Sequence, residues 1–239
     1  MKYPPNYIQC EQHSAQWYDL RLGKVTASRV ADVMSFLKNG ANKGKSSQAR
    51  EEYKFELLQE ALTGQTAEHY VSAAMQFGIE NEILAKEAYS SATGNEIESI
   101  GLVLHPHIPR SAASPDGLIG DDGLVECKVP TTKTHLGYFL GEVVPEDYKP
   151  QMLWQMACTG RSWCDFVSYD PRLPSEFNFF SIRFERDEEA IAEMEKQVEQ
   201  FIAELNTMAE VLQSHAKMRP QVENLPSVPK AELPPWREP

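Results

Sequence analysis

Two kinds of pattern are missing from this sequence. Its four cysteines form no CxxC pair, and a chain of 239 residues is long enough to fold without disulfides. Reduced thiols are therefore expected, and a zinc site is not. The chain also contains no run of about 18 apolar residues, and its N-terminus lacks a basic segment followed by an apolar one. We expect neither a membrane span nor a signal peptide, and a cytoplasmic protein.

An excess of basic charge is missing as well. Lys and Arg number 23 against 35 Asp and Glu, which gives a net charge of −12. Such a balance argues against a protein that coats nucleic acid electrostatically, but it is compatible with an enzyme that holds a local basic channel at DNA. Residues 38–48 form a glycine-rich stretch with three lysines and no acid. We expect an exposed, mobile loop there.

The composition is typical of one globular domain. Hydrophobic residues make up 41% and charged residues 24%, which argues against disordered, collagenous and coiled-coil chains. We expect a single domain over residues 1–218. Residues 219–239 hold six prolines, so an extended C-terminal tail is expected there.

Helical and strand-like patterns alternate along the chain. Residues 14–35 favour two short helices separated by Gly23, and we expect the hydroxyl of Thr26 or Ser28 to cap the second one. A turn at residues 121–123 predicts a hairpin between the strands that flank it. The last helix carries an apolar stripe and is expected to pack across the sheet. Further helices are expected at 48–63, 71–92, 132–140, 148–159 and 187–215, and strands at 95–105, 111–120, 124–130, 163–170 and 177–185.

The residues suited to chemistry lie around that hairpin. Asp116 ends an S-P-D segment, and Glu126-Cys127-Lys128 begins ten residues later. Alternate residues of a strand point to one face, so Glu126 and Lys128 project together while Cys127 points the other way. Two carboxylates that meet there supply the oxygen ligands that Mg²⁺ prefers, and an ammonium group beside the metal can orient an attacking water or help to deprotonate it. Alone the pattern is weak, because many hairpins carry an acid and a lysine.

Other segments occur in a fixed order around this pattern. Upstream, residues 17–28 read W-x-x-x-R-x-G-x-x-T-A-S. Next, one face of a predicted helix carries G-x-x-x-E-x-x-A-x-x-x-Y from Gly78 to Tyr89, with Glu82 as a third candidate carboxylate. Downstream, Tyr148-x-x-Gln151 opens a helix that ends at T-G, and residues 168–172 read SYDPR.

The order of Asp116, Glu126 and Lys128 resembles the PD-(D/E)XK nuclease superfamily. Together with the four other segments, it resembles the phage lambda exonuclease and YqaJ-type viral recombinase family. Five ordered segments over residues 17–185 are far more specific than any one of them. The resemblance implies an α/β fold with a restriction-endonuclease-like core, in which a central mixed β-sheet is flanked by helices.

The activity implied by the resemblance is that of a Mg²⁺-dependent 5′ to 3′ exonuclease. Such an enzyme digests one strand of linear double-stranded DNA to mononucleotides and leaves a 3′ overhang for phage recombination by strand annealing. Mn²⁺ is the alternative ion, since both ions suit oxygen ligands. The implied partners are DNA ends with a 5′-phosphate, a ring-shaped homotrimer of the chain itself, and a phage single-strand annealing protein in a bacterial host.

The resemblance also implies roles for residues at matching positions. The implied metal ligands are Asp116, Glu126, Glu82 and the backbone carbonyl of Cys127. Lys128 and Gln151 would complete the catalytic site. The residues implied to hold the 5′-phosphate and DNA are Arg21, Thr26, Ser28 and Ser114. An arginine fork with hydroxyl donors is suited to a terminal phosphate dianion.

Alternatives stay open at several positions. A nuclease that cuts internally, as restriction enzymes do, would carry a similar site, and a DNA-end binding scaffold would have lost catalysis. Arg21 has an alternative role in a surface salt bridge. His105 and His107 form an H-x-H pair suited to a transition metal, although a strand-end loop with both rings partly exposed is the simpler expectation. The acids of the final helix are expected on a solvated face, and Trp154 and Met156 in the core.

Overall fold

The computed structural model describes residues 3–67 and 72–218. The helices, where η marks a 3₁₀ turn, are α1 (Ala15–Arg21), η1 (Ala27–Arg29), α2 (Val30–Val33), α3 (Gln48–Thr63), α4 (Ala73–Thr93), α5 (Thr132–Gly141), η2 (Glu146–Tyr148), α6 (Lys149–Thr159) and α7 (Glu188–Met218). The strands are β1 (Tyr7–Ile8), β2 (Val25–Thr26), β3 (Ile97–Glu98), β4 (Leu102–Leu104), β5 (Ser111–Ala113), β6 (Gly117–Ile119), β7 (Gly123–Lys128), β8 (Trp163–Tyr169) and β9 (Phe179–Glu185). The tail predicted over residues 219–239 lies outside the described residues, so the domain boundary at residue 218 stays a prediction.

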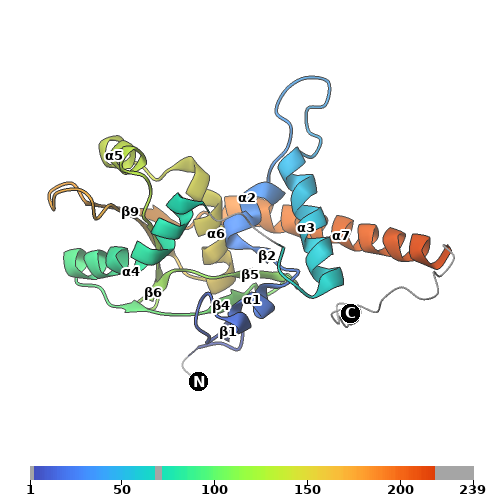
Figure 1. The fold of residues 1–239 in the computed structure, drawn as a ribbon, viewed down its shortest axis with the longest axis horizontal. Coiled ribbons are helices and arrows are strands. Elements are labelled where there is room, and N and C mark those ends of the chain that lie inside the picture. Colours follow the sequence, from blue (N-terminus) through green and yellow to red (C-terminus); the bar gives the residue numbers. More distant parts are fainter. Residues whose placement is uncertain (1–2, 68–71, 219–239) are drawn as a thin grey trace.

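The strands of the described ranges form two sheets, with helices around them (Figure 1). The larger sheet has the order β3-β6-β7-β8-β9, in which β7 and β8 run parallel and the other neighbours run antiparallel. It is the mixed sheet that the sequence predicts. The hairpin predicted around residues 121–123 is confirmed, since β6 and β7 pair antiparallel across that turn. The smaller sheet has the order β1-β4-β5-β2.

The run predicted as one strand over residues 111–120 is divided between the two sheets. Its first part is β5 in the smaller sheet, and its last part is β6 in the larger one. Pro115 lies between them and has no N–H to donate to a ladder, so strand pairing stops there. The run over residues 95–105 is divided too, near Gly101, where a Cβ atom would lie 2.3 Å from Cys10 Sγ. As a result, the S-P-D segment crosses from one sheet to the other.

Helix ends follow the local signals in the sequence. The hydroxyl of Ser47 accepts a backbone N–H in the first turn of α3, and Gly64 ends this helix at a φ of 66°. Gly94 ends α4 in the same left-handed conformation, at a φ of 73°. Both glycines stop their helices as predicted.

The second half of the helical segment predicted over residues 14–35 differs from the prediction. Val25 and Thr26 form β2, which pairs in parallel with β5. No side chain caps η1 or α2, so the cap predicted at Thr26 or Ser28 is wrong. The physical reason is that other partners compete for the Thr26 hydroxyl, which lies 3.5 Å from an Arg21 nitrogen and 3.4 Å from the Ser28 hydroxyl.

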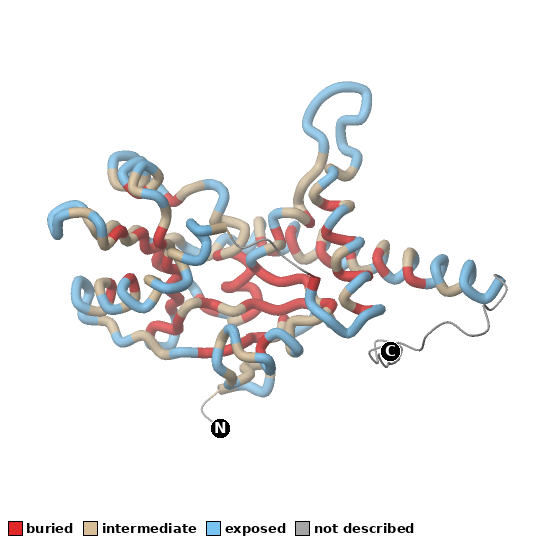
Figure 2. Tube along the Cα trace, viewed as in Figure 1, coloured by how far each residue is buried: buried red, intermediate tan, exposed pale blue. Residues whose placement is uncertain are grey.

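Helix α6 lies at the centre of the core (Figure 2). Trp154 and Met156 of this helix are fully buried, as predicted. Helix α7 buries the apolar stripe that contains Ile191, Met194, Val198, Phe201, Leu205 and Ala209. It packs against α2, α3 and α6. The stripe also belongs to the core cluster that Phe180, Ile182 and Phe184 of β9 pack against.

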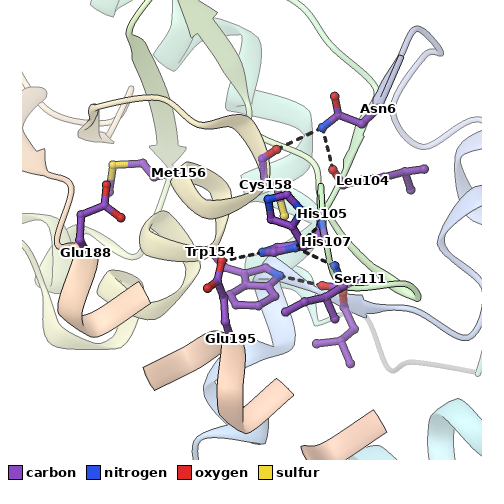
Figure 3. A network of polar contacts seen from close by, with 12 residues as sticks. Asn6, Leu104, His105, His107, Ser111, Trp154, Met156, Cys158, Glu188 and Glu195 are labelled. Carbon is purple, nitrogen blue, oxygen red and sulfur yellow. Dashed lines mark hydrogen bonds and ion pairs between the residues drawn. The ribbon is translucent and has the colours of Figure 1, made fainter. Parts of the chain in front are cut away.

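His105 is buried, which corrects the expectation that both histidines of the H-x-H pair are partly exposed. Its ring stacks on Trp154 at 5.0 Å (Figure 3), and Nδ1 accepts the backbone N–H groups of His107 and Ile108. Burial lowers the pKa of His105 to about 4. The neutral ring therefore packs against Trp154 and holds the loop that follows it. Its Nε2 lies 3.2 Å from Glu195 Oε1 without a well-aligned hydrogen bond.

The acid-rich face of α7 is only partly solvated. Glu204 binds the fully buried guanidinium of Arg50 through both oxygens, at 2.5 and 3.2 Å, and also binds Lys54 at 2.9 Å. Partial burial would raise the pKa of Glu204, but hydrogen bonds from Arg50 and Lys54 outweigh it and lower the pKa from 4.5 to about 2. The predicted solvated face is therefore wrong at this position, where α7 is joined to α3 by an ion-pair network.

The basic stretch over residues 38–48 projects from the body between α2 and α3 (Figures 1 and 2). An isolated bridge between Phe36 and Ser46 closes its base. Its three lysines are exposed, which confirms the exposed loop. No helix in the described part of the chain is long and apolar enough to cross a membrane.

We predict that Glu204→Gln lowers the free energy of unfolding by about 2 kcal/mol at pH 7, because the buried Arg50 charge loses its carboxylate. The wild-type pKa is lowered, so this contribution is complete above pH 4.5 and disappears as the pH falls towards 2. Denaturant unfolding at several pH values measures the difference. Glu210→Gln, at an exposed position of the same helix, serves as the control. Equal stability of Glu204→Gln and wild type at pH 7 would contradict this prediction.

Candidate active site

The two candidate carboxylates of the hairpin lie side by side. Asp116 directly precedes β6, and its Oδ2 accepts the backbone N–H of Cys127 at 2.6 Å. Glu126 and Lys128 point to the opposite face of β7 from the Cys127 side chain, which packs in the core with Tyr89 and Val125. The strand geometry thus brings together the acid, acid and lysine that the sequence pattern singles out.

Glu126 is a fully buried carboxylate with three donors. Its Oε1 accepts from Gln151 Nε2 at 2.6 Å and contacts Lys128 Nζ at 2.5 Å. Its Oε2 accepts from Gln155 Nε2 at 2.6 Å. A buried charge needs such partners, because desolvation without them costs several kcal/mol. Helix α6 supplies both amides from one face, since they lie four residues apart.

The third carboxylate comes from α4. Ala85 and Tyr89 of this helix are fully buried and pack against the sheet around β7 and β8. Glu82 lies one turn before Ala85 and forms an ion pair with Lys86 at 2.6 Å. Glu82 and Asp116 line a common cleft of about 290 Å³. The shared helical face predicted from the spacing therefore does turn Glu82 towards the hairpin.

The carboxylates of this cluster repel one another because they carry like charges. Burial raises the pKa of Asp116 well above its usual value, and the carboxylates of Glu126 and Glu82 raise it further. Burial would lower the pKa of Lys128, but Glu126 and Asp116 outweigh it, so that this pKa is raised and the ammonium stays charged. Lys86, whose pKa is also raised, adds a second cation to the cluster.

This donor set fits a divalent cation that prefers oxygen. Crowded carboxylates repel each other, which contributes to the raised pKa of Asp116, and a bound cation relieves that repulsion. Asp116, Glu126 and Glu82 are the oxygen donors of this cluster. In the described ranges no three acidic, histidine or cysteine side chains are arranged as a finished metal site. The three carboxylates are instead engaged by Lys128, Lys86, the glutamine amides and the Cys127 N–H.

The four residues predicted to bind a 5′-phosphate converge at a second cluster. Arg21 donates to the Ser114 hydroxyl at 3.4 Å and to the Thr26 hydroxyl at 3.5 Å, and Thr26 contacts Ser28. The guanidinium lies over the Trp17 ring at 4.1 Å. Burial lowers the pKa of Arg21, and the described residues provide it with no ion-pair carboxylate, so the alternative of a surface salt bridge is not supported.

The two clusters adjoin each other. Arg21 and Thr26 line a cleft of about 410 Å³, and His13 and Ile79 line both this cleft and the one that contains Glu82 and Asp116. The chain also connects them, since Ser114 is only two residues before Asp116. Two residues span at most about 7 Å. Asp116 therefore lies close to the residue that contacts Arg21.

Sequence reasoning missed two residues of the site. Gln155 binds the same carboxylate as Gln151, and the spacing of four residues on one helix is a signal that could have found it. Lys86 lies one turn after Glu82, at the same spacing. Tyr148, the first residue of the Y-x-x-Q segment, packs its ring over Lys128 at 4.9 Å.

Comparisons with known proteins identify the family. Residues 16–162 match the YqaJ-like viral recombinase domain. The chain belongs to this family. No match was found among curated proteins.

Several solved structures are similar to this chain. The alkaline exonuclease LHK-Exo from Laribacter hongkongensis is 45% identical with a TM-score of 0.78, over 85% of this chain and 98% of that chain. Its complex with dAMP is 45% identical with a TM-score of 0.79, over 86% and 100%. A phage-related exonuclease from Haemophilus somnus 129PT shows the same fold, at 16% identity and a TM-score of 0.59, over 79% and 96%. The family and the LHK-Exo similarity support a DNA exonuclease.

We predict that Asp116→Asn raises the free energy of unfolding of the metal-free protein by about 1 kcal/mol at neutral pH, as removal of functional strain often does. The asparagine oxygen can still accept the Cys127 N–H, while repulsion from Glu126 and Glu82 is lost. Denaturant unfolding in a chelator measures the change, with Asp121→Asn in the exposed turn as the control. A less stable Asp116→Asn would contradict the proposed repulsion.

Proposed function

We propose that this chain is a Mg²⁺-dependent 5′ to 3′ exonuclease that digests one strand of linear duplex DNA to mononucleotides and leaves a 3′ overhang. The observation that carries this proposal is the adjacency of the Arg21 cluster to the three carboxylates. A pocket suited to a terminal phosphate beside a hydrolytic site favours attack next to an end over attack within a strand.

The adjacency of the two clusters supports release of single nucleotides. Ser114 contacts Arg21, and Asp116 follows Ser114 by two residues, so the Cα atoms of Ser114 and Asp116 are at most about 7 Å apart. With the 5′-phosphate at Arg21, the next phosphodiester would lie near the carboxylates. The relative LHK-Exo has been solved with dAMP, a mononucleotide, which agrees with a product of this size.

Asp116 and Glu126 would hold the Mg²⁺ ion, with the Cys127 carbonyl and Glu82 as further ligands; Mn²⁺ is the alternative. The ion would supply Lewis-acid stabilisation of the phosphate and a water of lowered pKa. Lys128 keeps its ammonium charged beside Glu126, so it orients the attacking water and offsets negative charge on the phosphate. Gln151 holds Glu126 in place.

The wider assembly follows from the same proposal. The chain would act as a ring-shaped homotrimer around DNA and deliver its 3′ overhang to a phage single-strand annealing protein in the cytoplasm of a bacterial host. Residues 1–218 would form the nuclease domain. The exposed lysines of residues 38–48 would supply a local basic element for contact with a DNA backbone.

We predict that Arg21→Ala reduces the preference for 5′-phosphorylated over 5′-hydroxyl duplex ends by about 10- to 100-fold, since charge-assisted hydrogen bonds are worth about 1.5–3 kcal/mol. Initial rates on the two substrates measure the preference. Arg21→Lys, which keeps the charge but loses the fork, should fall in between.

Arg29→Ala provides a matched control for Arg21→Ala. Arg29 lines the same cleft, but its guanidinium is engaged by Asp32 and Glu56, each at 2.6 Å. Arg29→Ala should therefore leave the preference for 5′-phosphorylated over 5′-hydroxyl ends unchanged. An unchanged preference in Arg21→Ala itself would reject the assignment of Arg21 to the 5′-phosphate.

A further inference from the structure

The two oxygens of the Glu126 carboxylate have different surroundings. Oε2 faces the interior and accepts from Gln155, which is fully buried. Oε1 accepts from Gln151, which is half-buried, and from Lys128, whose side chain is 25% exposed. The partners of Oε1 are therefore partly exposed, whereas the partner of Oε2 is not exposed at all.

Gln155 is itself held in place by its surroundings. It lies in the buried run of α6 between Trp154 and Met156, neither of which is exposed at all. Its amide oxygen faces Cys164 Sγ at 3.9 Å, which leaves the NH₂ group directed at Glu126. The helix begins with Pro150 in its first turn and ends at Gly160, so both of its ends are defined. The amide is therefore a rigid clamp on one carboxylate oxygen.

We propose that Gln155 is a positioning residue that reserves Oε2 and leaves Oε1 as the single oxygen of Glu126 available to a cation. This inference rests on the proposed function, because it concerns the ion that the nuclease would use. Mg²⁺ takes single carboxylate oxygens in a strict octahedral shell, whereas the larger Ca²⁺ accepts carboxylates through both oxygens in a looser shell. A clamped Oε2 thus favours the small ion over the large one.

The test compares metal binding by the full-length wild type with that of Gln155→Met, which keeps the length of the side chain and removes its donor. Calorimetric titration with Mg²⁺ and separately with Ca²⁺, in the absence of DNA, measures both affinities. We expect Mg²⁺ affinity to fall by about 10- to 100-fold, as is usual for partners of metal ligands. Ca²⁺ affinity should fall less, so that the ratio of Mg²⁺ to Ca²⁺ affinity decreases.

Met156→Leu is the matched control, because it changes the next buried residue of α6 without touching Glu126. Thermal unfolding checks that each variant is folded. If Gln155→Met fails to fold, Gln155→Asn, whose amide is shorter by one methylene, takes its place in the same comparison.

Two outcomes would overturn the role of Gln155. One is an unchanged Mg²⁺ affinity in the folded variant, and the other is an equal loss for both ions. In either case the wild type can still bind Mg²⁺ and digest DNA ends, which would leave the proposed function standing. A wild type that neither binds Mg²⁺ nor cleaves DNA would instead overturn the proposed function, and the inference with it.

Discussion

A fully buried carboxylate, Glu126, is the constraint on which the rest of the site depends. Removing such a charge from water is costly unless donors surround it, and those donors come from two elements. Lys128 belongs to the same strand, and Gln151 and Gln155 belong to α6. Helix α6 must therefore pack tightly against the sheet, which explains why so much of it is buried.

The connection between the two sheets gives this chemistry its geometry. Because Pro115 lies between the two strands and Asp116 directly precedes β6, the same short segment presents Ser114 to Arg21 and the Asp116 carboxylate to the Cys127 N–H next to Glu126. The Arg21 cluster, proposed to bind a DNA end, and the carboxylate cluster, proposed to hydrolyse it, cannot move apart without breaking the crossing between the sheets. The proposed removal of one nucleotide at a time requires a fixed spacing of this kind.

Local patterns predict much of this fold, and long-range contacts account for the errors. The sequence predicts the helix ends at Gly64 and Gly94 and the β6-β7 hairpin, because these features depend on neighbouring residues. It does not predict the ion pair of Glu204, because the partner, Arg50, is 154 residues away. The family motifs located the acids but do not include Gln155. Its carboxylate partner lies 29 residues earlier, and its spacing from Gln151 was the one local signal for it. Thr26 was predicted as a helix cap, but its hydroxyl contacts Arg21 instead.

The most direct measurement follows the first product from a DNA end. A linear duplex labelled at one 5′-phosphate and a covalently closed circle of the same sequence are digested with Mg²⁺, and the labelled products are sized at early times. The account predicts a labelled mononucleotide as the first product and an intact circle, with no cleavage by Glu126→Gln. A labelled oligonucleotide as the first product, or cutting of the circle, would contradict it.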